Sequence, residues 1–208
     1  MLLDSPLVHV VEDDPGTQEE IRHLLTRSGY EVACFRGSRE FLEGYRPRHP
    51  QCVLLDVFLP FMSGLELQRR LHETSPDLPV ILLTAEASTQ TVLKAFRQGA
   101  EDFLEKPWEP EELLDTVGRA IEKDRQRSTL SLERDAARAR LARLSARERE
   151  VFERIVRGCS SKAVAAELHL SKRTVDFHRG GLMRKLEASS LAELVQLART
   201  AEAVRESA

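Results

Sequence analysis

Cysteine is scarce in this 208-residue chain, and its three residues, Cys34, Cys52 and Cys159, lack the C-x-x-C spacing of redox and zinc sites. Each falls among apolar or small residues, so we expect free, inert thiols in a reducing compartment. Long hydrophobic runs are missing too, because none approaches the ~18 residues of a transmembrane helix. The start Met-Leu-Leu-Asp-Ser-Pro lacks the basic region of a signal peptide. We therefore expect a cytoplasmic protein that does not contact a membrane.

Glycine and proline are absent from residues 119–142, a stretch dense in Arg, Glu, Ala and Leu, which favour helix. Some apolar residues in it are seven apart, but Glu133 and Arg140 occupy the matching d positions, so the pattern falls short of a coiled coil. We expect a charged helical linker over residues 123–142. This linker either continues the preceding helix or is broken near residues 128–131.

The total charge of −3 conceals two halves of opposite sign. Residues 1–122 carry 12 Lys and Arg against 22 Asp and Glu, a net charge of −10, whereas residues 123–208 carry 19 against 12, a net charge of +7. A basic half favours contact with nucleic acid, because neutralised phosphates supply most sequence-independent affinity. An Arg-rich, solvated helical surface would have the same charge, so this feature alone does not separate the two.

Five apolar runs of strand length recur along the acidic half, over residues 7–11, 31–35, 51–55, 79–83 and 102–104. Segments with helical spacing lie between them, and Pro110 suits the first turn of a last helix. Strands that alternate with helices predict an α/β fold with one parallel sheet covered on both faces.

Polar residues stand where these strands end. Glu12 and Asp13 follow the first strand, Asp56 the third, Thr84 the fourth and Lys106 the fifth. The carboxyl ends of parallel strands meet at one edge of an open sheet, where ligands gather. Neighbouring carboxylates repel one another unless a cation is present, and Mg²⁺ (or Mn²⁺) prefers such oxygen ligands. With a lysine and a hydroxyl for phosphoryl oxygens, the set predicts a site for a metal ion and a phosphoryl group.

The motifs around these residues resemble the receiver domain of response regulators. They are, in chain order, Val11-Glu12-Asp13-Asp14, Leu54-Leu55-Asp56 with Pro60 and Gly64, Thr84-Ala85, and Phe103-Leu104-Glu105-Lys106-Pro107. Their separations agree as well, with 28 residues from Asp56 to Thr84 and 22 from Thr84 to Lys106. The resemblance implies a five-stranded parallel, flavodoxin-like (βα)5 domain over residues 1–122.

The resemblance further implies that Asp56 accepts a phosphoryl group from a phosphohistidine on a sensor histidine kinase. Asp13 and Asp56 would bind Mg²⁺ directly. Glu12 would act through water, and the Phe58 carbonyl would be a backbone ligand. Lys106 would neutralise the phosphoryl oxygens during an in-line displacement.

A switch and a dimer are also implied by this family. Thr84 would move toward the new phosphate, and Phe103 would rotate into the space that Thr84 leaves. A face made of residues 89–98 and 103–120 would then favour a homodimer, because phosphorylation shifts the population toward an active form.

Four helices are predicted in the basic half. Ser145 and Glu148 form a capping box at the start of the first helix, and Gly158 can end it. A short helix over residues 161–168 follows, and after a tight turn Ser171 can cap a longer third helix. A short helix, a turn and a longer helix are the arrangement that places a helix in the major groove of DNA, although generic helical bundles share it.

The residues of this half resemble the LuxR-type helix-turn-helix domain of FixJ/NarL response regulators. The matching residues include Arg147, Glu150, Gly158, Lys162, Ala165, Leu170, Ser171, Arg173, Thr174, Val175, His178, Arg179, Met183, Arg184, Lys185 and Leu186. The resemblance implies an all-α, four-helix domain over residues 143–208 that binds double-stranded promoter DNA, with RNA polymerase as a further partner.

Nine residues are candidates for contact with phosphates or bases: Lys162, Lys172, Arg173, Thr174, Asp176, His178, Arg179, Arg184 and Lys185. Thr174 lies near a helix N-terminus, which favours anions. Asp176 would disfavour phosphate but can accept from a cytosine amino group. For each residue a solvated surface role competes with DNA contact, and His178 is also typical of a packed histidine.

Gly180 and Gly181 lie inside the predicted third helix, where each costs about 1 kcal/mol relative to alanine. They either allow the helix backbone to approach DNA closely or leave the helix less ordered until it binds. We favour the second interpretation.

We therefore expect a transcription factor rather than an enzyme, in which phosphorylation promotes dimerisation and promoter binding, as an activator. An RNA-binding antiterminator is an alternative, although Thr174, Val175 and His178 argue against it. A receiver-gated enzyme would need a nucleophile–base pair or a metal cluster, which residues 123–208 do not supply. The extra acid at Glu86 leaves open a regulator for which phosphorylation of Asp56 is dispensable.

Overall fold

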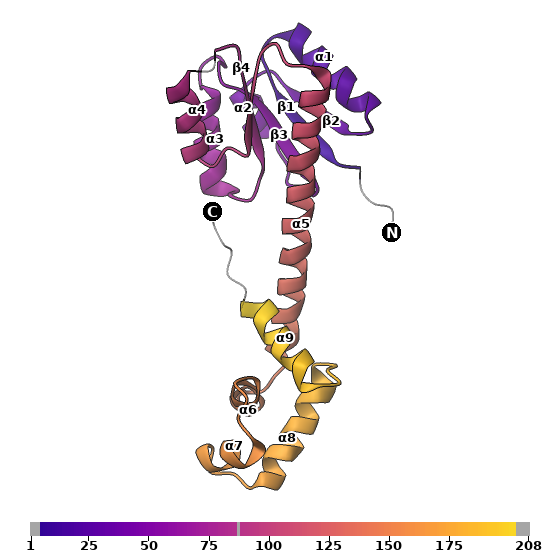
Figure 1. The fold of residues 1–208 in the computed structure, drawn as a ribbon, viewed down its shortest axis with the longest axis vertical. Helices are drawn as coiled ribbons and strands as arrows, with labels where there is room; N and C mark the ends of the chain where they lie inside the picture. Colours follow the sequence, from indigo (N-terminus) through magenta and orange to yellow (C-terminus); the bar gives the residue numbers. More distant parts are fainter. Residues whose placement is uncertain (1–4, 87, 203–208) are drawn as a thin grey trace. The chain divides into compact units, whose positions relative to one another are not determined.

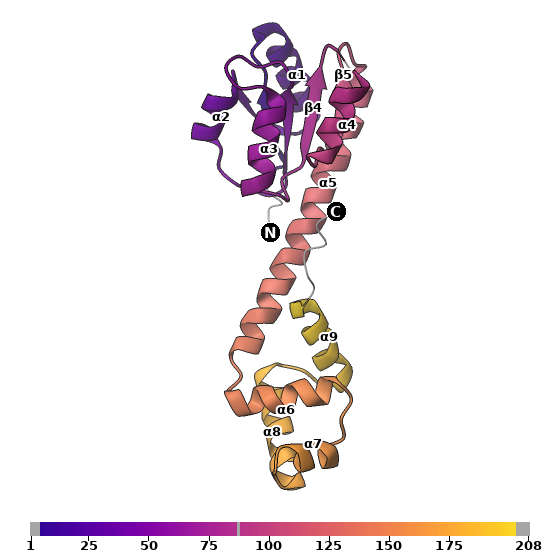
Figure 2. The same cartoon turned by 90° about the vertical axis from the view of Figure 1, so that its left-hand side faces the viewer.

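The computed structural model describes residues 5–86 and 88–202 (Figures 1 and 2). Most of the N-terminal start discussed above, residues 1–4, lies outside this range. The chain divides into two compact units, Met1–Ser128 and Thr129–Ala208. Within the described ranges, no helix has both the length and the apolar character needed to cross a membrane.

A five-stranded parallel sheet forms the centre of the first unit, in the order β2-β1-β3-β4-β5. Its strands are β1 Leu7–Val11, β2 Glu31–Phe35, β3 Gln51–Asp56, β4 Val80–Thr84 and β5 Asp102–Glu105. The strands β3 and β4 are buried at every residue, which is why they appear in the sequence as continuous apolar runs rather than alternating ones. The predicted α/β fold and its five strands are confirmed.

Helices cover both faces of this sheet: α1 Pro15–Arg27, α2 Ser38–Gly44, α3 Gly64–Thr74, α4 Thr89–Arg97 and α5 Pro110–Ala142 (Figure 1). On one face, Ile21 of α1 and Leu113 of α5 belong to a core with β1, β3, β4 and β5. On the other, Phe41, Leu67 and Ala95 bring α2, α3 and α4 into a second core. The sheet is therefore buried from both sides.

The (βα)5 fold expected from the resemblance includes a helix between the second and third strands, but α2 lacks the helical spacing that marks its neighbours in the sequence. It is seven residues long and buries only Ser38 and Phe41, so it shows no helical period. Phe41 holds it in place instead, because its ring stacks on Tyr45 and meets Phe35 and His9 edge-on, with centroids 5.1 to 5.8 Å apart. Tertiary aromatic contacts, which sequence spacing does not reveal, account for this helix.

The long helix α5 begins in the first unit and ends in the second. Asp124, fully buried, accepts from the backbone N–H of Gln51 at 2.8 Å, and the same oxygen lies 2.7 Å from His49 Nδ1. Further along the same helix, Ala137 is buried in the core of the second unit, and Arg138 donates to the carbonyl of Ala201 at 3.0 Å. The linker expected over residues 123–142 is thus helical throughout, and both of its ends make packing contacts.

Four further helices complete the second unit: α6 Ala146–Val156, α7 Ser161–Glu167, α8 Lys172–Lys185 and α9 Leu191–Glu202. The capping box at Ser145 is present, and Ser171 caps α8 by accepting from the N–H of Thr174 at 3.0 Å. Gly158 follows α6 with φ +88°, the left-handed conformation of a helix C-terminus. These local signals agree with the sequence, and the predicted helix boundaries hold to within about a residue.

An ion pair joins α6 to α8. Glu148, part of the capping box, accepts from Lys185 Nζ at 2.7 Å and from the N–H of Ser145 at 2.9 Å. The lysine contact, followed by the bonds from Ser145, lowers the pKa of Glu148 to about 2. Because the carboxyl is ionised far below its usual range, its stabilising effect is present above about pH 4.5 and is lost as the pH falls toward 2.

Glu148→Gln should therefore flatten the acid dependence of the second unit. The amide can keep the capping box but cannot pair with Lys185 as a charge. Hydrogen exchange of the α8 amides, measured between pH 5 and pH 2, should show a smaller loss of protection in this variant than in the wild type. Glu153→Gln, which changes an exposed carboxyl on the same helix, serves as the control. An equal acid response in wild type and Glu148→Gln would contradict this role.

Candidate functional site

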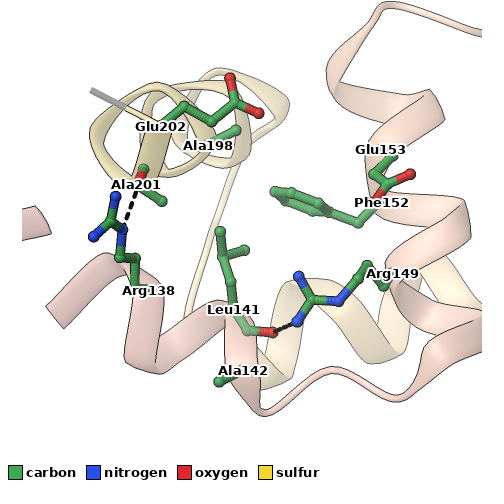
Figure 3. Close-up of a pocket in the computed structure, with 9 residues that line it drawn as sticks. All are labelled: Arg138, Leu141, Ala142, Arg149, Phe152, Glu153, Ala198, Ala201 and Glu202. Atoms are coloured by element: carbon green, nitrogen blue, oxygen red, sulfur yellow. Dashed lines mark hydrogen bonds between the residues drawn. The ribbon is translucent and has the colours of Figure 1, made fainter. Parts of the chain in front are cut away.

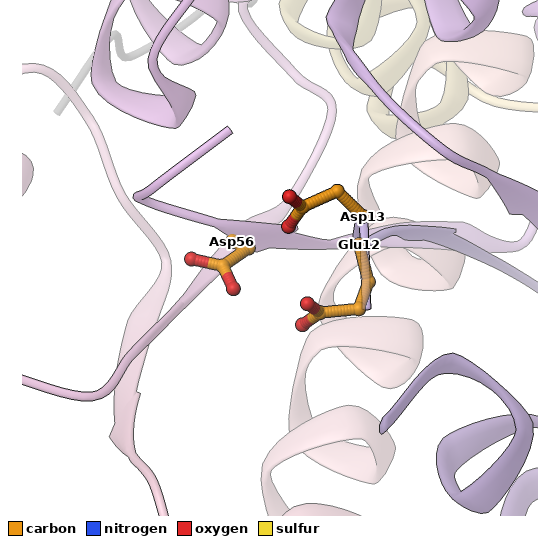
Figure 4. Close-up of side chains that lie close together, drawn as sticks. All are labelled: Glu12, Asp13 and Asp56. Carbon is orange, nitrogen blue, oxygen red and sulfur yellow. The ribbon is translucent and has the colours of Figure 1, made fainter. Parts of the chain in front are cut away.

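Three carboxylates meet at the carboxyl ends of β1 and β3 (Figure 4). The register pairs Val11 with Leu55, so Glu12 and Asp13 leave β1 beside Asp56 at the end of β3. Oxygens from all three groups lie within 4.8 Å of one another. Glu12 is 1% and Asp56 5% exposed, whereas Asp13 is open to solvent. The next acid, Asp14, caps α1, where its carboxylate accepts from the N–H of Thr17 at 2.6 Å.

Lys106 binds two of these carboxylates at once. Its Nζ lies 2.6 Å from Glu12 Oε2 and 2.5 Å from Asp56 Oδ2. Burial opposes its charged form, but the two carboxylates together outweigh burial and hold the pKa of Lys106 above its ordinary value. Burial raises the pKa of Glu12, and the charge of Asp56 adds to this effect while Lys106 opposes it. The lysine is therefore a fixed positive charge at the phosphoryl site that the sequence predicts.

The loop after β3 shapes the other side of Asp56. The N–H of Phe58 donates to Asp56 Oδ1 at 2.7 Å, so both carboxylate oxygens have a donor. Gly64 donates its N–H to the Val57 carbonyl at 3.0 Å as the loop returns. A Cβ at Gly64 would lie 2.1 Å from the backbone oxygen of Asp56, so only glycine fits there. The loop thereby brings the backbone of residue 58 against the central carboxylate.

The two residues expected to act as a switch lie on neighbouring strands. Thr84 ends β4 fully buried, and its hydroxyl donates to the carbonyl of Glu86 at 3.2 Å and accepts from the N–H of Glu86 at 3.3 Å. Phe103 is half-buried on β5, opposite Leu82, against the core of α2, α3 and α4. In this conformation the hydroxyl is held by the loop that leads to α4.

The charges of this pocket suit a divalent cation. Three carboxylates face one ammonium, which leaves an excess of two negative charges in a largely buried site. All the available donors are oxygens, the type that Mg²⁺ prefers, and the exposed Asp13 leaves room for water and phosphate ligands. The residues present therefore fit the metal that the sequence predicts.

The second candidate site is the pair α7 and α8, joined by a tight turn at His169 and Leu170 (Figure 2). Six of the nine predicted DNA contacts are exposed there, and their side chains have no ion pair or hydrogen bond with the described residues: Lys162, Lys172, Arg173, Asp176, Arg179 and Arg184. Thr174 and His178 are half-buried, and the Thr174 hydroxyl lies 2.7 Å from the Ser171 hydroxyl. Lys185 differs from the others because it pairs with Glu148.

One exposed residue of α8 was not among these candidates. Phe177 is 72% exposed, whereas Val175 and Leu182 of the same helix are fully buried. Helical spacing in the sequence indicates the packed side of α8 and, by subtraction, its open side, so the position of Phe177 could have been found from sequence. Aromatic residues are usually buried, so the sequence analysis did not consider Phe177 as a surface residue.

A cavity of about 350 Å³ lies elsewhere in the second unit, between the end of α5, α6 and α9 (Figure 3). Its arginines are already engaged: Arg138 donates to the Ala201 carbonyl, and Arg149 donates to the Leu141 carbonyl at 2.9 Å. The apolar residues Leu141, Ala142, Phe152, Ala198 and Ala201 and two carboxylates, Glu153 and Glu202, form the rest of its wall. The cavity thus lies where three helices of the second unit pack together.

Comparison with known proteins identifies the family of each unit. Residues 8–118 match the family described as response regulator receiver domain, and residues 142–198 match bacterial regulatory proteins of the luxR family. Nodulation protein W of Bradyrhizobium diazoefficiens is 37% identical over 93% of this chain and 86% of its own length. The transcriptional regulatory protein FixJ of Azorhizobium caulinodans is 36% identical, over 94% and 92%. The solved structure of the response regulator StyR is similar with a TM-score of 0.85, at 36% identity and coverages of 94% and 98%.

The chain belongs to the FixJ/NarL-type response regulators of two-component systems, with a receiver domain followed by a LuxR-type DNA-binding domain. It is accordingly a transcriptional regulator rather than an enzyme. A receiver domain implies a sensor kinase as partner, and the LuxR-type domain implies binding to DNA.

Trp108 should report on metal binding, because it is the sole tryptophan and lies half-buried two residues after Lys106. We expect Mg²⁺ to change its fluorescence in a saturable titration. Loss of even an outer partner of a metal site costs roughly 10- to 100-fold in affinity, so Asp13→Asn should weaken binding at least about tenfold. Asp14→Asn retains a helix cap and should bind as the wild type does. Equal affinity in both variants would exclude Asp13 as a ligand.

Alanine in place of Gly180 or Gly181 should stabilise the second unit. A Cβ at Gly180 meets nothing within 4 Å, and one at Gly181 lies 3.7 Å from Glu148 Oε1, an ordinary contact. Each substitution should raise the free energy of unfolding by up to about 1 kcal/mol and the melting temperature by roughly 4–8 °C. Gly158→Ala should instead lower the free energy of unfolding, because φ there is +88°, a conformation that alanine adopts only with strain. A melting temperature that does not rise for either variant would contradict the less-ordered helix inferred from the sequence.

Proposed function

We propose that phosphorylation of Asp56 switches this regulator between an inactive form and a DNA-binding dimer. The observation that carries the proposal is Lys106 Nζ, bound to both Asp56 and Glu12 at the edge of a buried sheet. A phosphoryl group transferred to Asp56 would bring negative charge next to this nearly buried carboxylate. Lys106 is already held at that point and can compensate the charge. The family implies the donor, a phosphohistidine on a sensor kinase.

In the proposed transfer, an oxygen of Asp56 attacks phosphorus, and the bond from phosphorus to the imidazole nitrogen breaks. Lys106 balances charge on the phosphoryl oxygens, and the N–H of Phe58 keeps the carboxylate oriented. Asp13 and Asp56 would hold Mg²⁺ directly, Glu12 would act through water, and the carbonyl of Phe58 would complete the set. The bound metal would supply further neutralisation of those oxygens.

The response proposed for Thr84 starts from its two hydrogen bonds to Glu86. A phosphoryl oxygen on Asp56 is a stronger acceptor than a backbone carbonyl, so the hydroxyl would donate to it and release the loop before α4. Phe103, half-buried on the neighbouring strand, would then rotate into the space that Thr84 leaves. Movement of the loop and the ring would thereby change the surface formed by α4, β5 and the first part of α5 when Asp56 is phosphorylated.

That side is the proposed dimer face, formed by α4, β5 and the first part of α5. On α4, Leu93 and Phe96 lie three residues apart and are 51% and 48% exposed, so they present an apolar patch. Arg119 of α5 pairs with Asp102 of β5 at 2.8 Å, and such surface pairs can be exchanged for pairs with a second copy. A symmetric contact through this face would join two receivers.

A dimer would carry two DNA-binding units to one promoter. Binding of the second unit then becomes intramolecular, which converts two weak contacts into one strong contact. We propose double-stranded promoter DNA as the target and activation through RNA polymerase as the output, which sets the site of action in the cytoplasm.

Asp56→Asn should abolish the switch. Beryllofluoride with Mg²⁺ mimics an aspartyl phosphate, and we expect it to convert the wild type from monomer to dimer in analytical ultracentrifugation. The variant should remain a monomer under the same conditions, and its promoter activation in cells should be lost.

The matched control is Asp77→Asn, an acid on the same domain away from the phosphoryl site. It should dimerise as the wild type does. Full dimerisation and activation by Asp56→Asn would instead support a regulator that works without phosphorylation.

A further inference from the structure

The side of α8 that faces away from the core combines charge with one large apolar ring. Phe177 is 72% exposed, and the nearest ring, that of His178, has its centroid 6.0 Å away. Arg173 lies one turn before it and Arg184 two turns after it, on the same side of the helix. A single exposed aromatic residue is unremarkable in general, so its position within a basic stripe is what matters.

The helix surface beside this ring is bare. Gly180 lies three residues after Phe177, and a Cβ built there would meet nothing within 4 Å. The helix backbone at Gly180 is therefore uncovered, and a bound surface can approach the backbone there. In a helix-turn-helix, the surface that the second helix approaches is the major groove of DNA.

The chemistry of that groove decides what an apolar ring can contact. Phosphates and most base edges there offer only polar or charged groups. The exception is the C5-methyl of thymine, the apolar group that the major groove displays. Arg173 and Arg184, exposed and without an ion pair among the described residues, suit the flanking phosphates.

We propose that Phe177 is a specificity-determining residue whose ring covers the 5-methyl of a thymine in each half-site. This inference rests on the DNA-binding role of the second unit. It adds the base that α8 selects and the side chain that selects it. A cytosine at the same position would leave the ring against a polar edge, so the residue discriminates against that base.

The test removes only the methyl group. Full-length protein with Mg²⁺ and beryllofluoride is used to select its binding sequence from random duplex DNA. Each thymine of the enriched sequence is then replaced by deoxyuridine, which pairs identically but lacks the methyl. One position per half-site should weaken binding by about fourfold for the wild type, the value for one buried methyl group. For Phe177→Ala the same replacement should change affinity less than twofold.

Leu132→Ala is the control, because Leu132 is 69% exposed on α5 and lies outside α7 and α8. Its affinity should fall as much as that of the wild type when thymine is replaced by deoxyuridine. A penalty that is equal in wild type and Phe177→Ala would overturn the inference, even where Phe177→Ala binds all sequences more weakly. That pattern would indicate a general role of the ring, such as contact with a second copy. Failure to enrich any sequence would instead count against the proposed DNA-binding function itself.

Discussion

The crowding of like charges at the end of two buried strands is the constraint on which the receiver depends. Glu12 and Asp56 are nearly inaccessible to water, and repulsion between them would be costly if Lys106 did not bind both. The strand register, the tight return of the loop at Gly64 and the position of β5 all serve to bring these groups together. A site so constructed changes its electrostatics sharply when one doubly or singly charged group is added, which is the property that a switch requires.

The sequence predicted this site because its signals are local. Four of the five strands are apolar runs followed by the polar residues of the site, and a parallel sheet brings such ends to one edge. Asp124 could not be assigned a role in this way. Its partners, Gln51 and His49, are more than 70 residues away in the chain, and only the folded sheet brings them beside α5. The same reason explains why residue spacing did not locate α2 within the expected (βα)5 fold, since one buried ring rather than a helical stripe holds this helix.

In the second unit the helix caps were predictable and the surface was only partly so. Ser145, Gly158 and Ser171 act within a few residues of their own positions, and their roles follow from the sequence alone. Composition identifies basic residues as a group but does not distinguish a free cation from a paired one. Lys185 and Arg184 are neighbours in sequence, yet one binds Glu148 and the other makes no ion pair within the described residues.

This pairing alters how the protein would respond to ionic strength. A cation releases counterions from DNA only by neutralising a phosphate, and Lys185 already has a carboxylate. Five basic candidates remain unpaired within the described part of the chain: Lys162, Lys172, Arg173, Arg179 and Arg184. Each phosphate that a cation neutralises releases about 0.9 counterion. If all five residues contact phosphates, the slope of log affinity against log salt concentration reaches about −4.5 for each DNA-binding unit. Glu148 thus makes binding less sensitive to salt than the number of lysines and arginines suggests.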